Sequence, residues 1–127
     1  MISKVKFVSI PVRDQDRAVE FYTKTLGFTL TTDQPFDGTQ RWIELEIPGA
    51  ETGIVLYTPK GHEDRIGTFA NLAYVTPDID ATYEALRAKG VEFVQPPKRE
   101  PWGTGAVFKD ADGNTFALSE ERVASSV

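Results

Sequence analysis

Aliphatic residues alternate with other residues near the start of the chain, at Val8, Ile10 and Val12. A period of two predicts a β-strand with one face packed against a core. Asp14 follows as a helix N-cap, and apolar residues at helical spacing continue to Gly27, which suits a helix C-cap. The chain is therefore expected to begin with a strand followed by a helix.

Three further strands are predicted in this part of the chain. Residues 28–31 come directly after the helix, and a turn-rich loop follows them. Residues 41–47 alternate strictly between two faces until Pro48 stops the pattern, and residues 53–58 form the last strand. The resulting order of elements is βαβββ.

The same order returns after a polar, turn-rich stretch at 59–67. A strand at 71–76 is followed by a helix that Asp78 caps and Gly90 ends. Further strands are predicted at 91–94, 105–109 and 115–119, with a proline-rich loop after the first and a turn at 110–114 before the last.

Matching residues of the two halves lie 64 positions apart: Phe7 with Asn71, Asp14 with Asp78, Asp16 with Asp80, and Glu20 with Glu84. A repeat of this length is a whole supersecondary module. We therefore predict an α+β fold in which residues 1–127 form a single domain. Its parts are a βαβββ module at about 5–58, a linker at about 59–68 and a second module at about 69–120.

Composition narrows the possible chemistry. The 127 residues carry a net charge of −5, which argues against a nucleic-acid partner because phosphate neutralisation needs clustered Lys and Arg. The absence of cysteine excludes disulfides, thiolate nucleophiles and Cys-ligated zinc, and a single histidine, His62, excludes a site with several imidazoles from one chain. No targeting segment or long apolar run is seen, so we expect a cytoplasmic protein without a membrane partner.

Short motifs follow one another in a fixed order along both modules. Those of the first module are Val8-Ser9-Ile10-Pro11-Val12 with Asp14, Phe21-Tyr22 and Leu26-Gly27-Phe28. Those of the second are Asp78-Ile79-Asp80, Gly90-Val91-Glu92-Phe93, Pro101-Trp102-Gly103 and Asp110-Ala111-Asp112-Gly113-Asn114. With this order and spacing the chain resembles the vicinal oxygen chelate superfamily over about residues 5–120. That superfamily groups glyoxalase I, bleomycin-resistance proteins and extradiol dioxygenases.

The resemblance implies two βαβββ modules side by side, with sheets that curl into a U-shaped cleft, and a homodimer as the assembly. One face of the strands then packs against the helices, and the other face lines the cleft. The residues expected on the helix-facing side are Val8, Ile10, Val12, Ile43, Leu45, Ile47, Ile54, Leu56, Leu72, Tyr74, Phe116 and Leu118.

The resemblance also implies where a metal would be held. Metal-dependent members place one ligand on the first strand and one on the last strand of each module. These positions match Phe7 and Val55 in the first module, and Asn71 and Ala117 in the second. Of these four side chains, only that of Asn71 offers a metal ligand, its amide oxygen, and this ligand is weak. His62 falls in the linker, either as a solvated residue or as a metal ligand or general base. We therefore expect no metal and no other cofactor.

A cleft with these residues is expected to hold a small molecule. The candidate lining residues are Phe7, Ser9, Trp42, Glu44, Val55, Tyr57, Asn71, Trp102, Phe108 and Ala117. Glu44 and Glu46, ~6.5 Å apart on one strand face, either hold a cation or amine or form an exposed rim. Trp102 is either a lid or a structural plug, and Asn71 either orients a ligand or satisfies a backbone group.

Two hypotheses follow for the function. The first is a metal-free protein similar to the bleomycin-resistance branch, which binds a small aromatic or cationic molecule beside Trp42. The alternative is a lyase, isomerase or dioxygenase of the glyoxalase type. In a metal-free version of the alternative, Glu44 acts as the base and Tyr57 as the proton donor.

Overall fold

The computed structural model describes residues 1–121 of the chain. The chain divides into two compact units, Met1–Ile66 and Gly67–Val127. The division falls inside the stretch 59–68 that was expected to be a linker, although Ile66 there is 6% exposed and belongs to the core.

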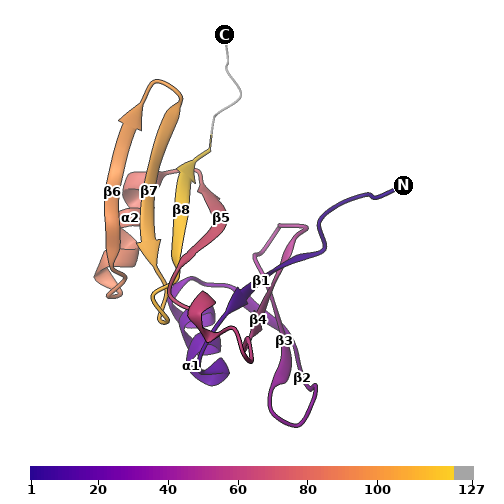
Figure 1. Ribbon diagram of the computed structural model, residues 1–127. Helices are drawn as coiled ribbons and strands as arrows, with labels where there is room; N and C mark the ends of the chain where they lie inside the picture. Colours follow the sequence, from indigo (N-terminus) through magenta and orange to yellow (C-terminus); the bar gives the residue numbers. More distant parts are fainter. Residues whose placement is uncertain (122–127) are drawn as a thin grey trace. The chain divides into compact units, whose positions relative to one another are not determined.

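The first unit is a four-stranded sheet with helix α1 on one side (Figure 1). Its strands lie in the order β1-β4-β3-β2, with β1 parallel to β4 and the other pairs antiparallel. The strands are β1 (Phe7–Pro11), β2 (Thr29–Pro35), β3 (Arg41–Glu46) and β4 (Gly53–Tyr57). The helical segments are α1 (Gln15–Glu20), the π-helix η1 (Phe21–Thr25) and the 3₁₀ turn η2 (Glu63–Arg65).

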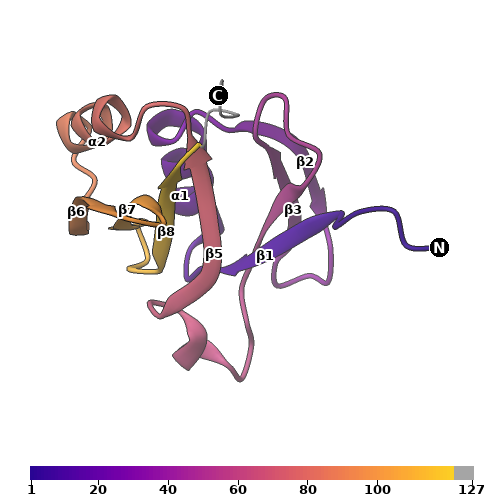
Figure 2. The same ribbon diagram turned by 90° about the horizontal axis from the view of Figure 1, so that it is seen from above.

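The second unit repeats this topology. Its strands lie in the order β5-β8-β7-β6, again with the first strand parallel to the last. Helix α2 contacts β6, β7 and β8 on one face of the sheet (Figure 2). The elements are β5 (Phe69–Thr76), α2 (Ile79–Ala88), β6 (Phe93–Glu100), β7 (Gly103–Lys109) and β8 (Thr115–Glu120). The predicted α+β fold with two βαβββ modules is confirmed.

Both helices begin at the predicted caps. The Asp14 carboxylate accepts a hydrogen bond from the Arg17 amide at 3.1 Å, and the Asp78 carboxylate accepts one from the Ala81 amide at 3.1 Å. Each bond satisfies an amide that has no partner inside its helix. Asp14 and Asp78, which match in the sequence repeat, therefore have the same structural role: each caps the start of its helix.

Three elements differ from the sequence prediction. Strand β2 continues to Pro35, through residues that were expected to form a loop. The first helix ends in a π-helical turn, in which the Leu26 amide donates to the Phe21 carbonyl at 3.2 Å. The stretch after Val94 was expected to be a proline-rich loop, but β6 continues through it to Glu100. Strand β6 lies at the edge of its sheet, and register shifts on either side of Gln95 accommodate Pro96 and Pro97.

The core of each unit lies between its sheet and its helical layer. Of the residues expected on the helix-facing side, those that are buried are Ile10, Val12, Ile43, Leu45, Ile54, Leu56, Phe116 and Leu118. Tyr22 from the π-helix and Ile79 from α2 complete the two cores, at 1% and 0% exposure. Within the described residues 1–121, no helix is long and apolar enough to span a membrane.

Candidate binding face

The face of the first sheet that points away from its helices carries most of the residues expected to bind a ligand. Strand register places Ser9 opposite Val55, Val55 opposite Glu44, and Glu44 opposite Thr32, which forms one row across all four strands. Phe7 lies two residues before Ser9 on β1, and Trp42 lies two residues before Glu44 on β3, so both side chains point to the same side as this row. We call this surface the open face of the first sheet.

An aromatic pocket of about 340 Å³ lies on the open face. The Phe7 and Trp42 rings meet edge to face with their centroids 5.6 Å apart, and the Phe36 ring lies 5.7 Å from Trp42 on the other side. Val55, between β1 and β3, is only 2% exposed even though it faces away from the helices. The pocket is lined by Phe7, Ser9, Phe36, Gln40, Arg41, Trp42, Val55, Leu56 and Tyr57.

The structure thus brings together five of the residues that the sequence placed in a ligand site: Phe7, Ser9, Trp42, Val55 and Tyr57. It also adds Phe36, which the sequence analysis missed. Phe36 directly follows β2, where it carries no strand or helix periodicity. The signal that would have found it is an exposed aromatic residue beside the turn residues Asp37 and Gly38.

The loop that carries Phe36 is held by its own hydrogen bonds. The Asp37 carboxylate accepts bonds from the Thr39 amide, the Thr39 hydroxyl and the Gln40 amide, at 3.0, 2.7 and 3.1 Å. These bonds, those from Thr39 above all, lower the pKa of Asp37. The Gln40 side chain donates to the Thr58 carbonyl at 3.0 Å and accepts from the Thr58 amide at 2.9 Å. The rim of the pocket is therefore largely preformed.

Arg41 lines the pocket, but its charge is used elsewhere. Its guanidinium bonds Asp33 of β2 at 2.8 Å and Asp16 of α1 at 2.6 Å, and these bonds raise the pKa of Arg41. Its backbone is held by Gln15, whose side chain accepts from the Arg41 amide at 2.9 Å and donates to the Arg41 carbonyl at 2.8 Å. The positive charge of Arg41 is therefore neutralised by two carboxylates.

Glu44 is bonded to a residue of the aromatic pocket, although it is not one of the lining residues itself. The Trp42 indole Nε1 donates to Glu44 Oε1 at 2.6 Å, so the carboxylate and the ring fix each other. Glu44 also borders a second, polar hollow of about 470 Å³ on the same unit. The polar hollow is lined by Ser3, Lys4, Lys6, Thr31, Glu44, Leu45, Glu46, Ala50, Glu51, Thr52 and Gly53.

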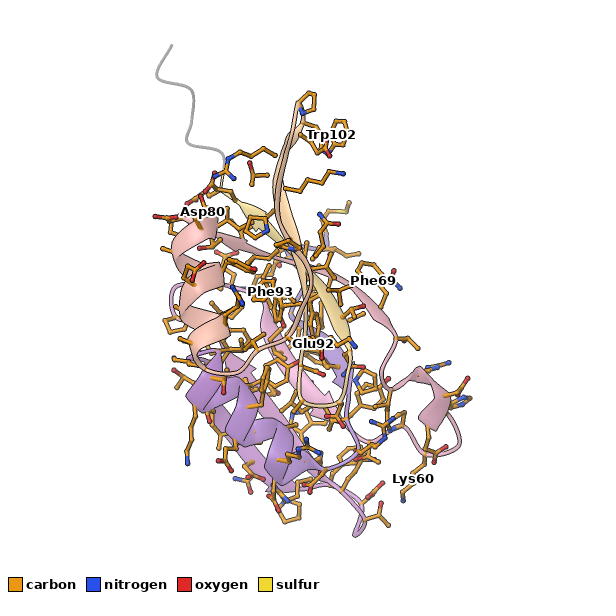
Figure 3. All side chains as sticks on the ribbon, turned by 90° about the vertical axis from the view of Figure 1, so that its left-hand side faces the viewer. Lys60, Phe69, Asp80, Glu92, Phe93 and Trp102 are labelled. Atoms are coloured by element: carbon orange, nitrogen blue, oxygen red, sulfur yellow. The ribbon has the colours of Figure 1, made fainter. Side chains whose placement is uncertain are left out.

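The candidates of the second unit have more varied surroundings. Asn71 is exposed and has a φ of +54°, between the two ends of a register shift in the pairing of β5 with β8. Ala117 lies opposite Ala73 and Val107. Trp102 is 74% exposed at the turn between β6 and β7 (Figure 3), beside a hollow of about 390 Å³.

Phe108 corrects one prediction. It was expected on the cleft face, but it pairs directly with Phe116, so the two side chains share the core face of the sheet. Phe108 is 2% exposed and packs against the rings of Tyr74, Phe93 and Phe116. In the middle of β7 both alternating sets of residues are apolar or small, and the one charged residue of the strand, Lys109, stands at its end, so the sequence marks the outer face only weakly.

The residues at the positions where the resemblance placed metal ligands are Phe7, Val55, Asn71 and Ala117. Ser9 pairs with Val55 in the first unit and Ala73 pairs with Ala117 in the second, which supports the equivalence of Val55 and Ala117. The side chains of Phe7, Val55 and Ala117 offer no lone pair to a cation, and Asn71 offers only its amide oxygen. Among residues 1–121, no three His, Asp or Glu side chains are grouped so as to hold a metal, and His62 is exposed just before η2.

Comparison with known proteins agrees with this architecture. The sequence profile of the Glyoxalase/Bleomycin resistance protein/Dioxygenase superfamily matches residues 4–118. The Bacillus subtilis protein YetH is 37% identical over 120 residues, which cover 94% of this chain and 100% of YetH. The chain therefore belongs to the glyoxalase/bleomycin resistance protein/dioxygenase superfamily.

Two solved structures are similar in both sequence and fold. A superfamily member from Sphaerobacter thermophilus DSM 20745 is 38% identical, with a TM-score of 0.87 over 94% of this chain and 98% of that one. TnmS3, an antibiotic binding protein from Streptomyces sp. CB03234, is 38% identical, with a TM-score of 0.82 over 94% of this chain and 96% of that one.

Proposed function

We propose that this protein binds a small planar aromatic molecule in the aromatic pocket, without a metal ion. The observation that carries the proposal is the grouping of Phe7, Phe36, Trp42 and Tyr57 around one preformed pocket. Its volume of about 340 Å³ lies within the range of small-molecule sites. The similarity to TnmS3, an antibiotic binding protein, supports a role in sequestering such a compound.

The composition of the pocket favours binding over catalysis. Aromatic faces stabilise a flat ligand by offset stacking and by removing apolar surface from water. Ser9 and Gln40 are polar lining residues, but the Gln40 amide is already bonded to the backbone of Thr58. The metal positions carry no side chain that would polarise a carbonyl or activate oxygen.

A screen of planar compounds by thermal shift, followed by calorimetric titration of the hits, tests the proposal. Replacing Trp42 with Ala removes the central ring of the pocket and should weaken a hit by at least about tenfold. Val94→Ala is the control, because Val94 is an exposed apolar residue on β6 of the other unit and should leave the affinity unchanged. Equal affinities of wild type and Trp42→Ala would place the ligand elsewhere.

The enzymatic alternative makes a different prediction. A glyoxalase-type lyase or isomerase should convert a hemithioacetal, with or without added Ni or Zn, and should contain stoichiometric metal if it is metal-dependent. We expect neither turnover nor bound metal by elemental analysis. Turnover that disappears in both Glu44→Gln and Tyr57→Phe would instead support these residues as base and proton donor.

We also propose a cytoplasmic homodimer. Strand β5 is at the edge of its sheet and pairs only with β8, and it exposes Phe69 and Val75 at 52% and 64%. An open strand edge with exposed apolar residues is a common site of self-association. Light scattering coupled to gel filtration should give twice the chain mass, and a Val75→Lys variant should lower it. A monomeric mass at micromolar concentration would refute the dimer.

A further inference from the structure

A carboxylate is fixed by a hydrogen bond to one of the rings that line the aromatic pocket. Glu44 lies two residues from Trp42 on the same face of β3, and its Oε1 accepts the indole N–H at 2.6 Å. A carboxylate offers about four acceptor sites, and the indole occupies one of them. The group therefore keeps acceptor capacity while its position is set by the ring that a ligand is proposed to contact.

Two cations, Arg41 and Lys60, are committed to other carboxylates. Arg41, next to Trp42, bonds Asp33 and Asp16, and Lys60 pairs with Asp37 at 3.9 Å. Among the described residues 1–121, no Lys, Arg or His nitrogen lies within 4.0 Å of the Glu44 carboxylate. Glu44 thus places a half-buried negative charge beside aromatic rings.

The polar hollow beyond Glu44 does not reverse this charge. It is lined by the carboxylates of Glu44, Glu46 and Glu51 and by two lysines, Lys4 and Lys6. The lysines come from the segment before β1, whereas Glu44 is hydrogen-bonded to Trp42, a ring that lines the aromatic pocket. A positive group on a ligand that reaches past the Trp42 indole N–H would therefore meet the Glu44 carboxylate.

We infer that the aromatic pocket selects planar ligands that carry a positive charge, and that Glu44 is the residue that determines this selectivity. The inference rests on the proposed function, because it assigns the charge of the same ligand. Two effects act in the same direction: a cation is attracted to aromatic faces, and a charge-assisted hydrogen bond to a half-desolvated carboxylate is stronger than a neutral one. An anionic ligand of the same shape is repelled.

Three probes with one ring system separate charge from shape. At neutral pH 9-aminoacridine is a cation, acridone is neutral and acridine-9-carboxylate is an anion. Calorimetric titration of the full chain should rank their affinities in that order. In Glu44→Gln the amide oxygen still accepts the indole N–H, so the pocket keeps its shape while its charge is lost. That variant should weaken 9-aminoacridine by about tenfold or more and change acridone by less than about twofold.

Glu46→Gln is the matched control, because Glu46 lies two residues further along the same face and is exposed. It should change the affinity for 9-aminoacridine by less than about threefold. Raising the salt concentration should weaken the cation in wild type and have little effect in Glu44→Gln. Circular dichroism of each variant checks that it is folded.

The outcomes separate this inference from the proposed function. If acridone and 9-aminoacridine bind equally well, or Glu44→Gln weakens neither, the charge selectivity is wrong. Trp42-dependent binding of acridone would then still support an aromatic site. If none of the probes binds and the wider planar screen gives no hit that depends on Trp42, both the proposed function and this inference are overturned.

Discussion

Replacing Gln15 with Ala should cost a large part of the stability of the first unit. Gln15 is 8% exposed at the first position of α1, and its amide joins the helix to two strands. It donates to the carbonyls of Arg41 and Leu56 at 2.8 and 3.0 Å and accepts from the Arg41 amide at 2.9 Å. In Gln15→Ala these three hydrogen bonds are lost.

The size of the effect follows from those three bonds. A net contribution of about 1 kcal/mol for each gives a loss of about 3 kcal/mol in the free energy of unfolding. Water reaching the half-buried Arg41 backbone reduces this loss, and the cavity left by the side chain increases it. The better helix propensity of Ala offsets only a few tenths of a kcal/mol. For a chain of this length the loss corresponds to a fall in Tm of about 10 °C.

Urea unfolding followed by tryptophan fluorescence measures this change, because Trp42 lies next to Arg41 in the affected unit. Gln34→Ala, an exposed glutamine of β2 in the same sheet, is the control and should cost less than about 0.5 kcal/mol. Gln15→Glu keeps an acceptor for the Arg41 amide but points a carboxylate at two carbonyl oxygens, so it should be at least as destabilising. If Gln15→Ala costs no more than Gln34→Ala, the helix is not held to the strands in this way.

Two further predictions concern the second unit. Burial, and then the nearby charge of Asp110, raise the pKa of Tyr74 above its ordinary value of 10.0. The folded protein therefore keeps the full stability due to neutral Tyr74 below pH 10, and above pH 10 the free energy of unfolding falls by about 1.4 kcal/mol per pH unit. Chemical unfolding between pH 9 and about 11.5 measures this fall, which should be absent in Tyr74→Phe. Asn114, which is 1% exposed, accepts from the Gly67 amide at 2.8 Å and donates to the Asp110 carboxylate at 2.9 Å. Asn114→Ala should therefore lower the unfolding free energy by about 2–3 kcal/mol in a thermal melt, and an unchanged Tm would contradict this role.

Local chemistry explains which parts of the fold could be predicted from the sequence. Asp14 and Asp78 were identified as N-caps because capping depends on one side chain and an amide three residues further on. The open face of β3 was identified because Ile43 and Leu45 alternate with Trp42 and Glu44, so polar and apolar residues mark different sides.

What could not be predicted depends on pairing between distant strands. Phe108 and Val107 are both apolar, so only the register with β8 decides which of them faces the core. The position of Asn71 follows from a register shift and a left-handed backbone conformation that the alternation pattern does not show. Phe36 was missed because its place over Trp42 depends on the turn that Asp37 holds.

The two units share a topology but differ on their open faces, and this difference supports a ligand site in the first. The order of strands is the same in the two units, and the core residues Leu56 of the first and Leu118 of the second are both buried. Packing has therefore constrained the two cores in the same way. Facing away from the helices, the first sheet carries Trp42 and Val55 around an aromatic pocket. The central strands of the second sheet, β7 and β8, carry Val107 and Ala117 on that side, and β5 exposes Phe69 and Val75. Stability alone would not require a sheet to concentrate aromatic rings on the side opposite its core, since that side needs only to be solvated. Their concentration beside an oriented carboxylate is therefore better explained by recognition of a ligand than by folding.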